Sequence, residues 1–393
     1  MGRRIAFWRE HRGLTQADFG RLMGQSRRWV QDLEGGLRQA DPRMSVLSRA
    51  AEVLRIPLEQ LLSDPTPARQ ELPLPVEVEA LADALHHLPA ELPERPVQLL
   101  TVRSRLEFCY QAWAACHYLA LARELPGLLA DGHGVAVKSA EGAVLLSRAY
   151  QLAASLLYKY SSSSCAPGVV AAERALVTAE RSGDVVAIGS SARRVARGLM
   201  HQHRYSGAAE YATATARRLR TPLERAGRPG LSALGMLHLV AAIAVTGEGR
   251  SSRTVSAAAD RLTEAGEVAE RQGGVGADFT GFGITNVRLH EVDVLLRLND
   301  PWEAVVHGEM ISSDDLSRLP RERHARHLVT TARALVQTRR RDQATAALVE
   351  AERLAHEEIR RPAVVGIVRD QLLLSPSPSW ELRALAERCG ISV

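Results

Sequence analysis

The stretch Gly13–Gly36, GLTQADFGRLMGQSRRWVQDLEGG, predicts two short helices joined by a tight turn. Thr15 is placed to cap the first helix. The expected buried side of that helix carries Ala17, Phe19, Gly20 and Met23. Gly24 supplies the turn, because glycine enters the left-handed region without steric cost. Ser26 then caps the second helix, so the stretch predicts a helix, a turn and a helix.

The second helix of this stretch has one apolar and one polar face. Val30 and Leu33 point inward, three residues apart on the helix. The outward side chains are those of Arg27, Arg28, Gln31 and Asp32. Forked donors, amides and carboxylates are the groups with which a helix reads base edges in a major groove. The pattern therefore indicates binding to double-stranded DNA.

The same stretch resembles the helix-turn-helix of the lambda-repressor-like (Cro/CI, or XRE) family. The matching positions are Leu14-Thr15-Gln16, Gly20, Met23-Gly24, Ser26, Val30, Leu33-Glu34 and Gly36. The resemblance continues through Pro42, Leu47, Ala51, Leu54, Ile56 and Leu61-Leu62. It implies a complete domain of five short helices over residues 1–62. Two positions depart from the family: Gln25 replaces the usual apolar turn residue, and Gly35 stands where a basic residue is common.

The first, fourth and fifth helices of this domain are expected on either side of the motif. The first is predicted over Arg3–His11, with Trp8 in the core, and the fourth over Met44–Leu54. Pro57 opens a last short helix that ends at Leu62.

The resemblance also implies roles for individual residues. Arg27, Arg28 and Asp32 are expected to reach bases, with Trp29 and Gln31 flanking them. An Arg28 bidentate to guanine would contribute about 1–3 kcal/mol of discrimination. Asp32 has two interpretations, since its carboxylate either accepts a hydrogen bond from cytosine or repels a phosphate.

Phosphate contacts are expected on both sides of the recognition helix. Gln16 resembles the phosphate-contacting glutamine of the family, and Arg38 and Arg43 in the following loop face the other flank. The alternative for each arginine is a solvated surface charge. Glu34 is expected to be structural, because a carboxylate directed at phosphate would be costly.

Composition supports an all-α protein with its positive charge at one end. Among 393 residues, 46% are hydrophobic and only 4% aromatic, which favours helices over strands. The net charge is +5. Residues 1–62 hold eleven arginines and seven acidic residues, so the rest of the chain is nearly neutral. This asymmetry indicates a polyanion-binding surface at the N-terminus.

The segment 63–75, SDPTPARQELPLP, carries four prolines and predicts a semi-rigid linker. From Val76 to the C-terminus the pattern is helical. One pair of helices has the stripe Val185, Ile188, Ala192, Val195 and Leu199, a turn at His201–Ser206, and then Ala208 and Ala212. A second has Leu328, Ala332 and Leu335, a turn at Arg339–Asp342, and then Ala344, Leu348 and Ala351. A weaker one has Leu295, Pro301-Trp302 and Ala304.

These pairs resemble tetratricopeptide repeats, in which small residues let two antiparallel helices approach. Ala208 and Ala344 are 136 residues apart, four periods of about 34, whereas Ala304 falls out of phase. Degenerate pairs in residues 76–393 are therefore expected, with insertions near Arg220–Leu231 and Gln272–Ile284, and a capping helix over Ser379–Cys389. The fold class predicted for the whole chain is a five-helix domain followed by an α-solenoid.

A helix-turn-helix joined to such repeats is similar to the peptide-responsive regulators called the RRNPP family and to regulators of high-GC actinobacteria. The resemblance implies a homodimer that binds an inverted-repeat operator, and a peptide or small-molecule effector, as in quorum sensing. The alternative is an interaction protein, whose repeats hold another protein and whose helix-turn-helix serves as a docking module.

Catalytic, cofactor and metal motifs are not evident in the sequence. No phosphate loop or HExxH pattern occurs. The pairs His324/His327 and His201/His203 have no third ligand nearby, which favours surface or helix-terminal histidines. The cysteines form no CxxC pair, and Cys109 and Cys116 are expected on one buried helix face. The apolar run Leu234–Val245 is too short to span a bilayer. A cytoplasmic non-enzyme without cofactor is expected.

Overall fold

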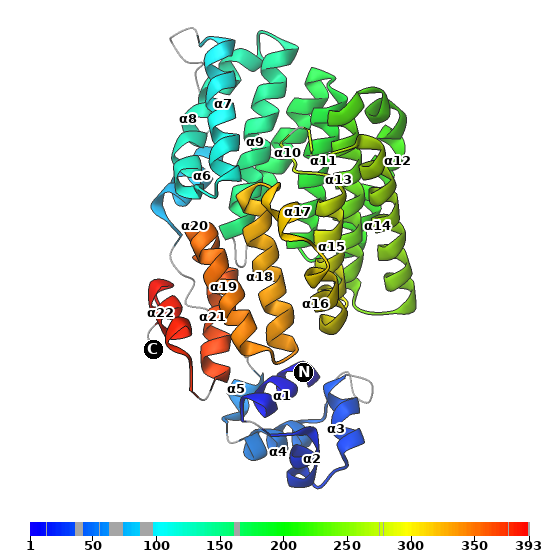
Figure 1. Ribbon diagram of the computed structural model, residues 1–393, viewed down its shortest axis with the longest axis vertical. Coiled ribbons are helices and arrows are strands. Elements are labelled where there is room, and N and C mark those ends of the chain that lie inside the picture. Colours follow the sequence, from blue (N-terminus) through cyan, green and yellow to red (C-terminus); the bar gives the residue numbers. More distant parts are fainter. Residues whose placement is uncertain are drawn as a thin grey trace. The chain divides into compact units, whose positions relative to one another are not determined.

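The computed structural model describes residues 1–12, 14–35, 42–54, 56–62, 74–86, 97–160, 166–274, 276–277, 279–375 and 377–391. These residues form helices and connecting turns, with no β-strand among them (Figure 1). The chain divides into two compact units, Met1–Pro73 and Leu74–Val393. The all-α prediction is confirmed. The predicted linker lies outside the described residues except for Leu74 and Pro75.

The described residues of the N-terminal unit form five helices in the predicted order. They are α1 (Gly2–His11), α2 (Gln16–Met23), α3 (Arg27–Glu34), α4 (Met44–Leu54) and α5 (Leu58–Leu62). Both predicted caps form, since the Thr15 hydroxyl accepts from the Asp18 amide and the Ser26 hydroxyl accepts from the Trp29 amide, each at 3.1 Å. Gly24 is left-handed, with φ of 70°. The local signals of the motif are therefore confirmed.

The core of this unit holds α2 and α3 against α1 and α4. Its buried members are Ile5, Phe19, Val30, Leu33, Leu47, Ala50, Ala51, Leu54 and Leu61, with Trp8 partly buried beside them. Gly20 is required by packing, because a Cβ there would lie 2.9 Å from the Gln25 carbonyl oxygen. Ala17 was expected on the buried side but is exposed, since α2 buries only Phe19 and Gly20 fully.

The second unit contains the remaining helices of the chain. The first group is α6 (Val76–His86), α7 (Leu99–Ala114), α8 (Tyr118–Ala136), α9 (Ala140–Tyr160), α10 (Ala166–Ser182), α11 (Val185–His201), α12 (Tyr205–Arg225), α13 (Gly227–Val245) and α14 (Ser252–Gln272). The second group is α15 (Ile284–Arg297), α16 (Pro301–Glu309), α17 (Ser313–Ser317), α18 (Arg321–Gln337), α19 (Arg341–Leu354), α20 (His356–Ile359), α21 (Pro362–Leu374) and α22 (Trp380–Arg388). A short 3-10 helix, η1 (Thr246–Glu248), follows α13.

Four hairpin turns in the described part of this unit share one backbone conformation. They join α7 to α8, α11 to α12, α15 to α16, and α18 to α19. The second residue after each first helix is left-handed: Cys116, His203, Asn299 and Arg339 have φ between 59° and 64°. The next amide donates to the carbonyl five residues earlier, as from Arg204 to Leu199 at 2.9 Å. Three of these turns are the ones that the sequence predicts.

Alanine occupies an equivalent buried position in the three predicted hairpins. Ala208, Ala304 and Ala344 each follow the left-handed residue by five positions and are fully buried. Leu199, Leu295 and Leu335 stand nine positions before them. In the α7–α8 hairpin the two residue types are exchanged: Ala112 stands at the position of the leucines, and Leu121 stands at the position of the alanines. This exchange is why the sequence pattern does not reveal the fourth hairpin.

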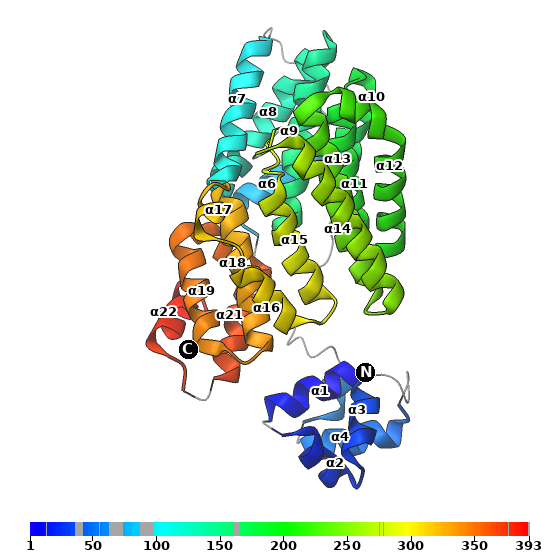
Figure 2. The ribbon, with the colours of Figure 1, turned by 45° about the vertical axis from the view of Figure 1, so that its right-hand side comes forward.

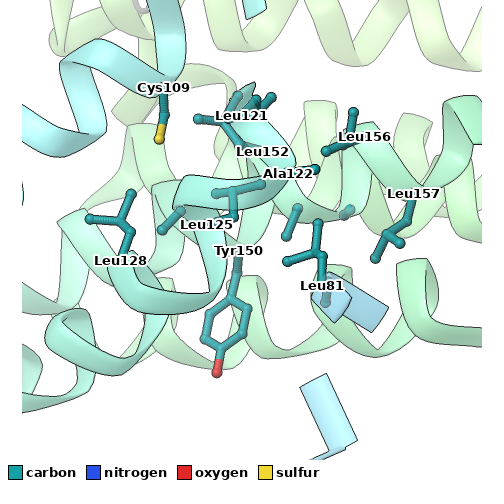
Figure 3. Packing of buried hydrophobic residues seen from close by; sticks show 14 of the residues in the cluster. Leu81, Cys109, Leu121, Ala122, Leu125, Leu128, Tyr150, Leu152, Leu156 and Leu157 are labelled. Atoms are coloured by element: carbon teal, nitrogen blue, oxygen red, sulfur yellow. The ribbon is translucent and has the colours of Figure 1, made fainter. Parts of the chain in front are cut away.

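The largest core of the second unit lies among its early helices. Figure 3 shows leucines of α6, α8 and α9, with Cys109 and Tyr150, gathered in one apolar cluster. Cys109 is buried on α7, as expected, and burial raises its pKa to about 12. Cys116 is also buried, but it lies in the turn after α7 and not on the same helix face.

The last helices of the second unit pack against the first ones. Lys159 of α9 lies 2.8 Å from a carboxylate oxygen of Glu322 in α18 and 3.0 Å from one of Glu358 in α20. The Tyr118 hydroxyl of α8 donates to Glu358 at 2.6 Å. Burial lowers the pKa of Lys159, and the two carboxylates oppose that change. This buried network joins segments up to 240 residues apart, so the unit is not a simple open stack of pairs.

α13 is the most apolar helix of the chain. The segment Gly227–Glu248 is long and apolar enough to cross a membrane, but 89% of its most apolar window is buried in the protein. Phe282 packs so closely that a Cβ on Gly235 would lie 1.9 Å from its ring. α13 is thus a core helix. The insertion expected near Arg220–Leu231 is wrong, because α12 and α13 are separated only by Ala226, whereas a loop does follow α14.

Candidate nucleic-acid interface

The outer face of α3 carries the polar side chains that the sequence singles out. Arg27, Arg28 and Gln31 are exposed, while Val30 and Leu33 are buried in the core. A spacing of three or four residues puts Gln31 on the same helix face as both arginines. This face presents guanidinium and amide donors to the solvent, as the prediction requires.

Arg27 and Arg28 make no hydrogen bond or ion pair in the described structure, which distinguishes them from other arginines of the unit. Arg21 pairs with Asp18 at 3.3 Å, and Arg49 pairs with Glu52 at 3.0 Å. An exposed guanidinium without an acidic partner keeps all five of its N–H donors for a ligand. Forming a contact to DNA would therefore break no ion pair of the protein.

A buried ion pair holds the C-terminal end of α3. The Arg9 guanidinium of α1 donates to both carboxylate oxygens of Glu34, at 2.6 and 3.0 Å, and to the Leu14 carbonyl at 2.8 Å. Both paired side chains are 7% exposed. Burial opposes the charge of Arg9, but the hydrogen bond and charge of Glu34 outweigh it and raise the pKa of Arg9. Glu34 is thus structural, as expected, and it fixes the recognition helix on α1.

Gln16 joins this ion pair at the start of α2. Its side-chain amide donates to the second carboxylate oxygen of Glu34 at 2.9 Å. One amide hydrogen of Gln16 is therefore engaged within the protein, and the other is left for the predicted phosphate contact. The sequence does not reveal this second role, because Gln16 and Glu34 lie 18 residues apart.

The other predicted contact residues have different surroundings. Trp29 is half-buried against the domain core, and Asp32 is half-buried on α3. Arg43 is exposed directly before α4, where its carbonyl accepts hydrogen bonds from the amides of the first turn. Arg38 lies outside the described residues.

The prediction that the paired histidines lie at the surface or at helix ends is only partly correct. His327 is buried, and burial lowers its pKa to about 4. His201 ends α11 and stacks on Tyr158, with ring centroids 4.7 Å apart. In the described part of the chain, no cluster of three or more His, Cys, Asp or Glu residues could hold a metal ion. Tyr150, Tyr158 and Tyr160 are core residues.

Comparison with known families agrees with the geometry of the N-terminal unit. Residues 1–63 match the model of a helix-turn-helix domain family. The unit is therefore a helix-turn-helix domain, and this match supports a DNA-binding regulator. No curated protein and no solved structure matches the chain.

Proposed function

We propose that this protein is a sequence-specific DNA-binding transcriptional regulator in which α3 enters the major groove. The proposal rests on the guanidinium groups of Arg27 and Arg28, which are exposed and make no ion pair with any described residue, on a helix fixed by Arg9 and Glu34. Because the ion pair of Arg9 and Glu34 already fixes α3, little entropy is lost when the helix binds DNA, and the contacts of its exposed side chains can discriminate between bases.

The residues of the unit divide into base-reading and phosphate-binding groups. Arg27, Arg28 and Asp32 read bases, and Trp29 and Gln31 flank them. Phosphate contacts come from Gln16, Arg38 and Arg43. Phosphate contacts set the position of the protein on the duplex, and base contacts set the sequence preference.

The second unit acts as a dimerising sensor built from tetratricopeptide-like helix pairs. The shared hairpin turns and the buried alanines of three of them support the repeat architecture. Trp302, Val306 and Met310 form an exposed apolar stripe along α16 and its end, which supports contact with a second copy of the chain. Two-fold symmetry would place the half-sites about 34 Å apart or a multiple of this distance.

Selection of bound sequences from a random duplex pool, at two salt concentrations, tests DNA recognition. We expect an inverted repeat and an affinity that falls steeply with salt. The Arg27→Ala/Arg28→Ala variant should lose the sequence preference, whereas Arg21→Ala should keep it because Arg21 is paired on α2. Unchanged preference and salt dependence in the double variant would contradict the proposal.

Light scattering tests the dimer. We expect twice the chain mass at micromolar concentration, and half of this value for Trp302→Glu, because a charge opposes burial of the stripe. A monomeric native protein would exclude the dimer. Negligible, salt-insensitive DNA binding together with capture of a stoichiometric partner would instead favour the adaptor function.

A further inference from the structure

The second unit contains a group of arginines that outnumber their acidic neighbours. α15 carries Asn286, His290, Asp293 and Arg297 on one face, and α18 carries Arg323, Arg326, Thr330 and Arg333. Figure 2 shows α15 and α18 side by side, and they are in contact. α11 adds Arg197. We call these five arginines, Arg197, Arg297, Arg323, Arg326 and Arg333, the arginine cluster.

The acidic groups near the arginine cluster are too few to neutralise it. Asp293 pairs with Arg297 at 3.0 Å, and the charges of Arg297, Arg326 and Arg333 lower its pKa to about 2 in spite of burial. Glu322 lies 3.6 Å from Arg323 but pairs more closely with Lys159. Among the described residues, Arg197, Arg326 and Arg333 make no ion pair with an acidic side chain, although the charge of Asp293 acts on Arg326 and Arg333.

Arg197 is surrounded by like charge. Burial, followed by the positive charges of Arg326, Arg297 and Arg323, lowers its pKa to about 9. Arg197, Arg323 and Arg326 are partly buried. Like charges held together in a recess are costly, and an anion among them would remove the cost.

A small pocket opens directly onto the arginine cluster. Its volume is about 20 Å³, and its lining includes Asn286, His290, Asp293, Arg323, Arg326 and His327. This volume has room for about one water-sized group, such as one oxygen atom of an anion whose remainder lies in a neighbouring space. Asn286 and His327 line it as buried side chains, and the Asn286 Oδ1 and His327 Nδ1 atoms have no hydrogen-bond partner among the described residues. Buried polar atoms without a protein partner, on residues that line a pocket, favour a polar occupant of that pocket.

A larger cavity lies next to this pocket and shares Arg323 with it. Its volume is about 380 Å³, and its lining includes the rings of Tyr110, Trp113 and Phe279 together with the charged side chains of Glu322 and Arg323. The rings of Tyr110 and Phe279 are stacked, with centroids 4.1 Å apart. Phe279 is 59% exposed, so its ring also offers a free surface. A cavity of this size and lining suits the flat apolar body of a small molecule.

We propose that the arginine cluster and the adjoining aromatic cavity bind a small aromatic anion, such as an aryl phosphate or an aromatic carboxylate. Arg323 and Arg326, which line the small pocket, hold the charged group, and Tyr110, Trp113 and Phe279, which line the larger cavity, hold the ring. The inference deepens the proposed sensor function, because it assigns the chemical class and the site of the effector.

Calorimetric titration of the full chain at constant ionic strength tests this site. The probes are phenyl phosphate and its two halves, inorganic phosphate and phenol. We expect phenyl phosphate to bind at least tenfold more tightly than inorganic phosphate, and phenol to show no binding. Equal affinities for phenyl phosphate and inorganic phosphate would overturn the aromatic part of the proposal.

Variants distinguish binding at a specific site from a general attraction of the anion to the positive charge of the protein. Arg326→Gln should weaken phenyl phosphate binding at least tenfold, and its Tm without ligand should stay equal or rise, since one repelling charge is gone. Arg217→Gln is the matched control, because Arg217 is exposed on α12 and makes no ion pair within the described part of the chain. Phe279→Ala should remove the preference for phenyl phosphate over inorganic phosphate. Equal losses in Arg326→Gln and Arg217→Gln, or no loss in Arg326→Gln, would overturn the site.

The titration contains no DNA, so its outcome is independent of operator binding. Failure of anion binding in a protein that still selects an operator would reject the effector site and leave the DNA-binding proposal intact. Anion binding without operator selection would keep the site and reject the regulator.

Discussion

The unpaired arginines of α3 and those of the arginine cluster differ in their access to solvent. Arg27 and Arg28 are exposed on the outer face of a short helix, whereas Arg197 and Arg326 are partly buried among other cations. An exposed row of guanidinium groups can meet a polyanion as wide as a DNA duplex. The partly buried arginines of the arginine cluster leave room only for a small anion. The same side chain thus suits two different ligands, and the surrounding helices decide which.

Each unit is also held by one buried ion pair or network, and removing one partner should affect only that unit. The largest effect is expected for Lys159→Met, which removes the cation shared by the buried Glu322 and Glu358 and leaves only the arginines beside them, Arg323 and Arg361. Breaking such a network costs about 3–5 kcal/mol. Urea unfolding should show this loss in the transition of the second unit.

Lys138→Met is the control for this variant, since Lys138 is exposed and is the only other lysine of the chain. A Lys159→Met protein as stable as Lys138→Met would show that the buried network does not support the second unit.

The corresponding variant in the N-terminal unit is Glu34→Ala. It leaves Arg9 and Gln16 without their shared acceptor, at a cost of about 3 kcal/mol. A five-helix domain has little stability to lose, so DNA binding should disappear while the transition of the second unit stays unchanged. Glu52→Ala, at an exposed pair, should bind DNA normally. DNA binding retained by Glu34→Ala would mean that α3 does not depend on this ion pair.

Acid should destabilise the second unit selectively. Burial lowers the pKa of His238 to about 4, from a usual value of about 6.5. Between these values the unfolded chain binds the proton and the folded one does not, so stability falls as pH decreases from about 6.5 to 4. His238 alone should cost about 2 kcal/mol at pH 5.

The N-terminal unit has a single histidine, His11, so it should lack this pH dependence. The measurement is the urea midpoint of each unit at pH 7 and pH 5, with His238→Met as the variant that should reduce the change. Equal acid sensitivity of both units would exclude the buried histidine as the cause.

Arg43 should contribute less than the arginines of α3, because it is expected to contact phosphate only. Arg43→Ala should weaken binding to all sequences to a similar extent and reduce the salt slope by about 1. Binding at a series of salt concentrations, on operator and on unrelated DNA, measures both effects. A loss confined to the operator would assign Arg43 to base reading.

The smallest effect is expected at the shared hairpin turn. Arg339 is exposed and left-handed, with φ of 63°. Glycine adopts this conformation without the steric cost that arginine has there, but it loses more backbone entropy on folding. The balance of the two effects should make Arg339→Gly stabilise the second unit by about 0.5–1 kcal/mol. Thermal unfolding measures this gain, and a loss of stability would show that the Arg339 side chain supports the turn.

The N-terminal domain was predictable because its signals are local. Thr15, Gly24 and Ser26 act on neighbours within three residues, and Val30 and Leu33 show the buried face directly. The outward position of Arg27 and Arg28 follows from the same periodicity. The contact of Gln16 with Glu34 was not predictable, because it depends on how α2 crosses α3.

The sequence by itself determined the all-helical class, the helix-turn-helix and three of the four equivalent hairpins, because caps, turns and alanine spacing act over a few residues. Only the tertiary structure decided that Lys159 meets Glu322 and Glu358, and that Arg197 joins arginines of α15 and α18. These groups lie more than 90 residues apart, and no local pattern encodes which helix faces meet. Their burial, and with it their charge state, depends on that packing.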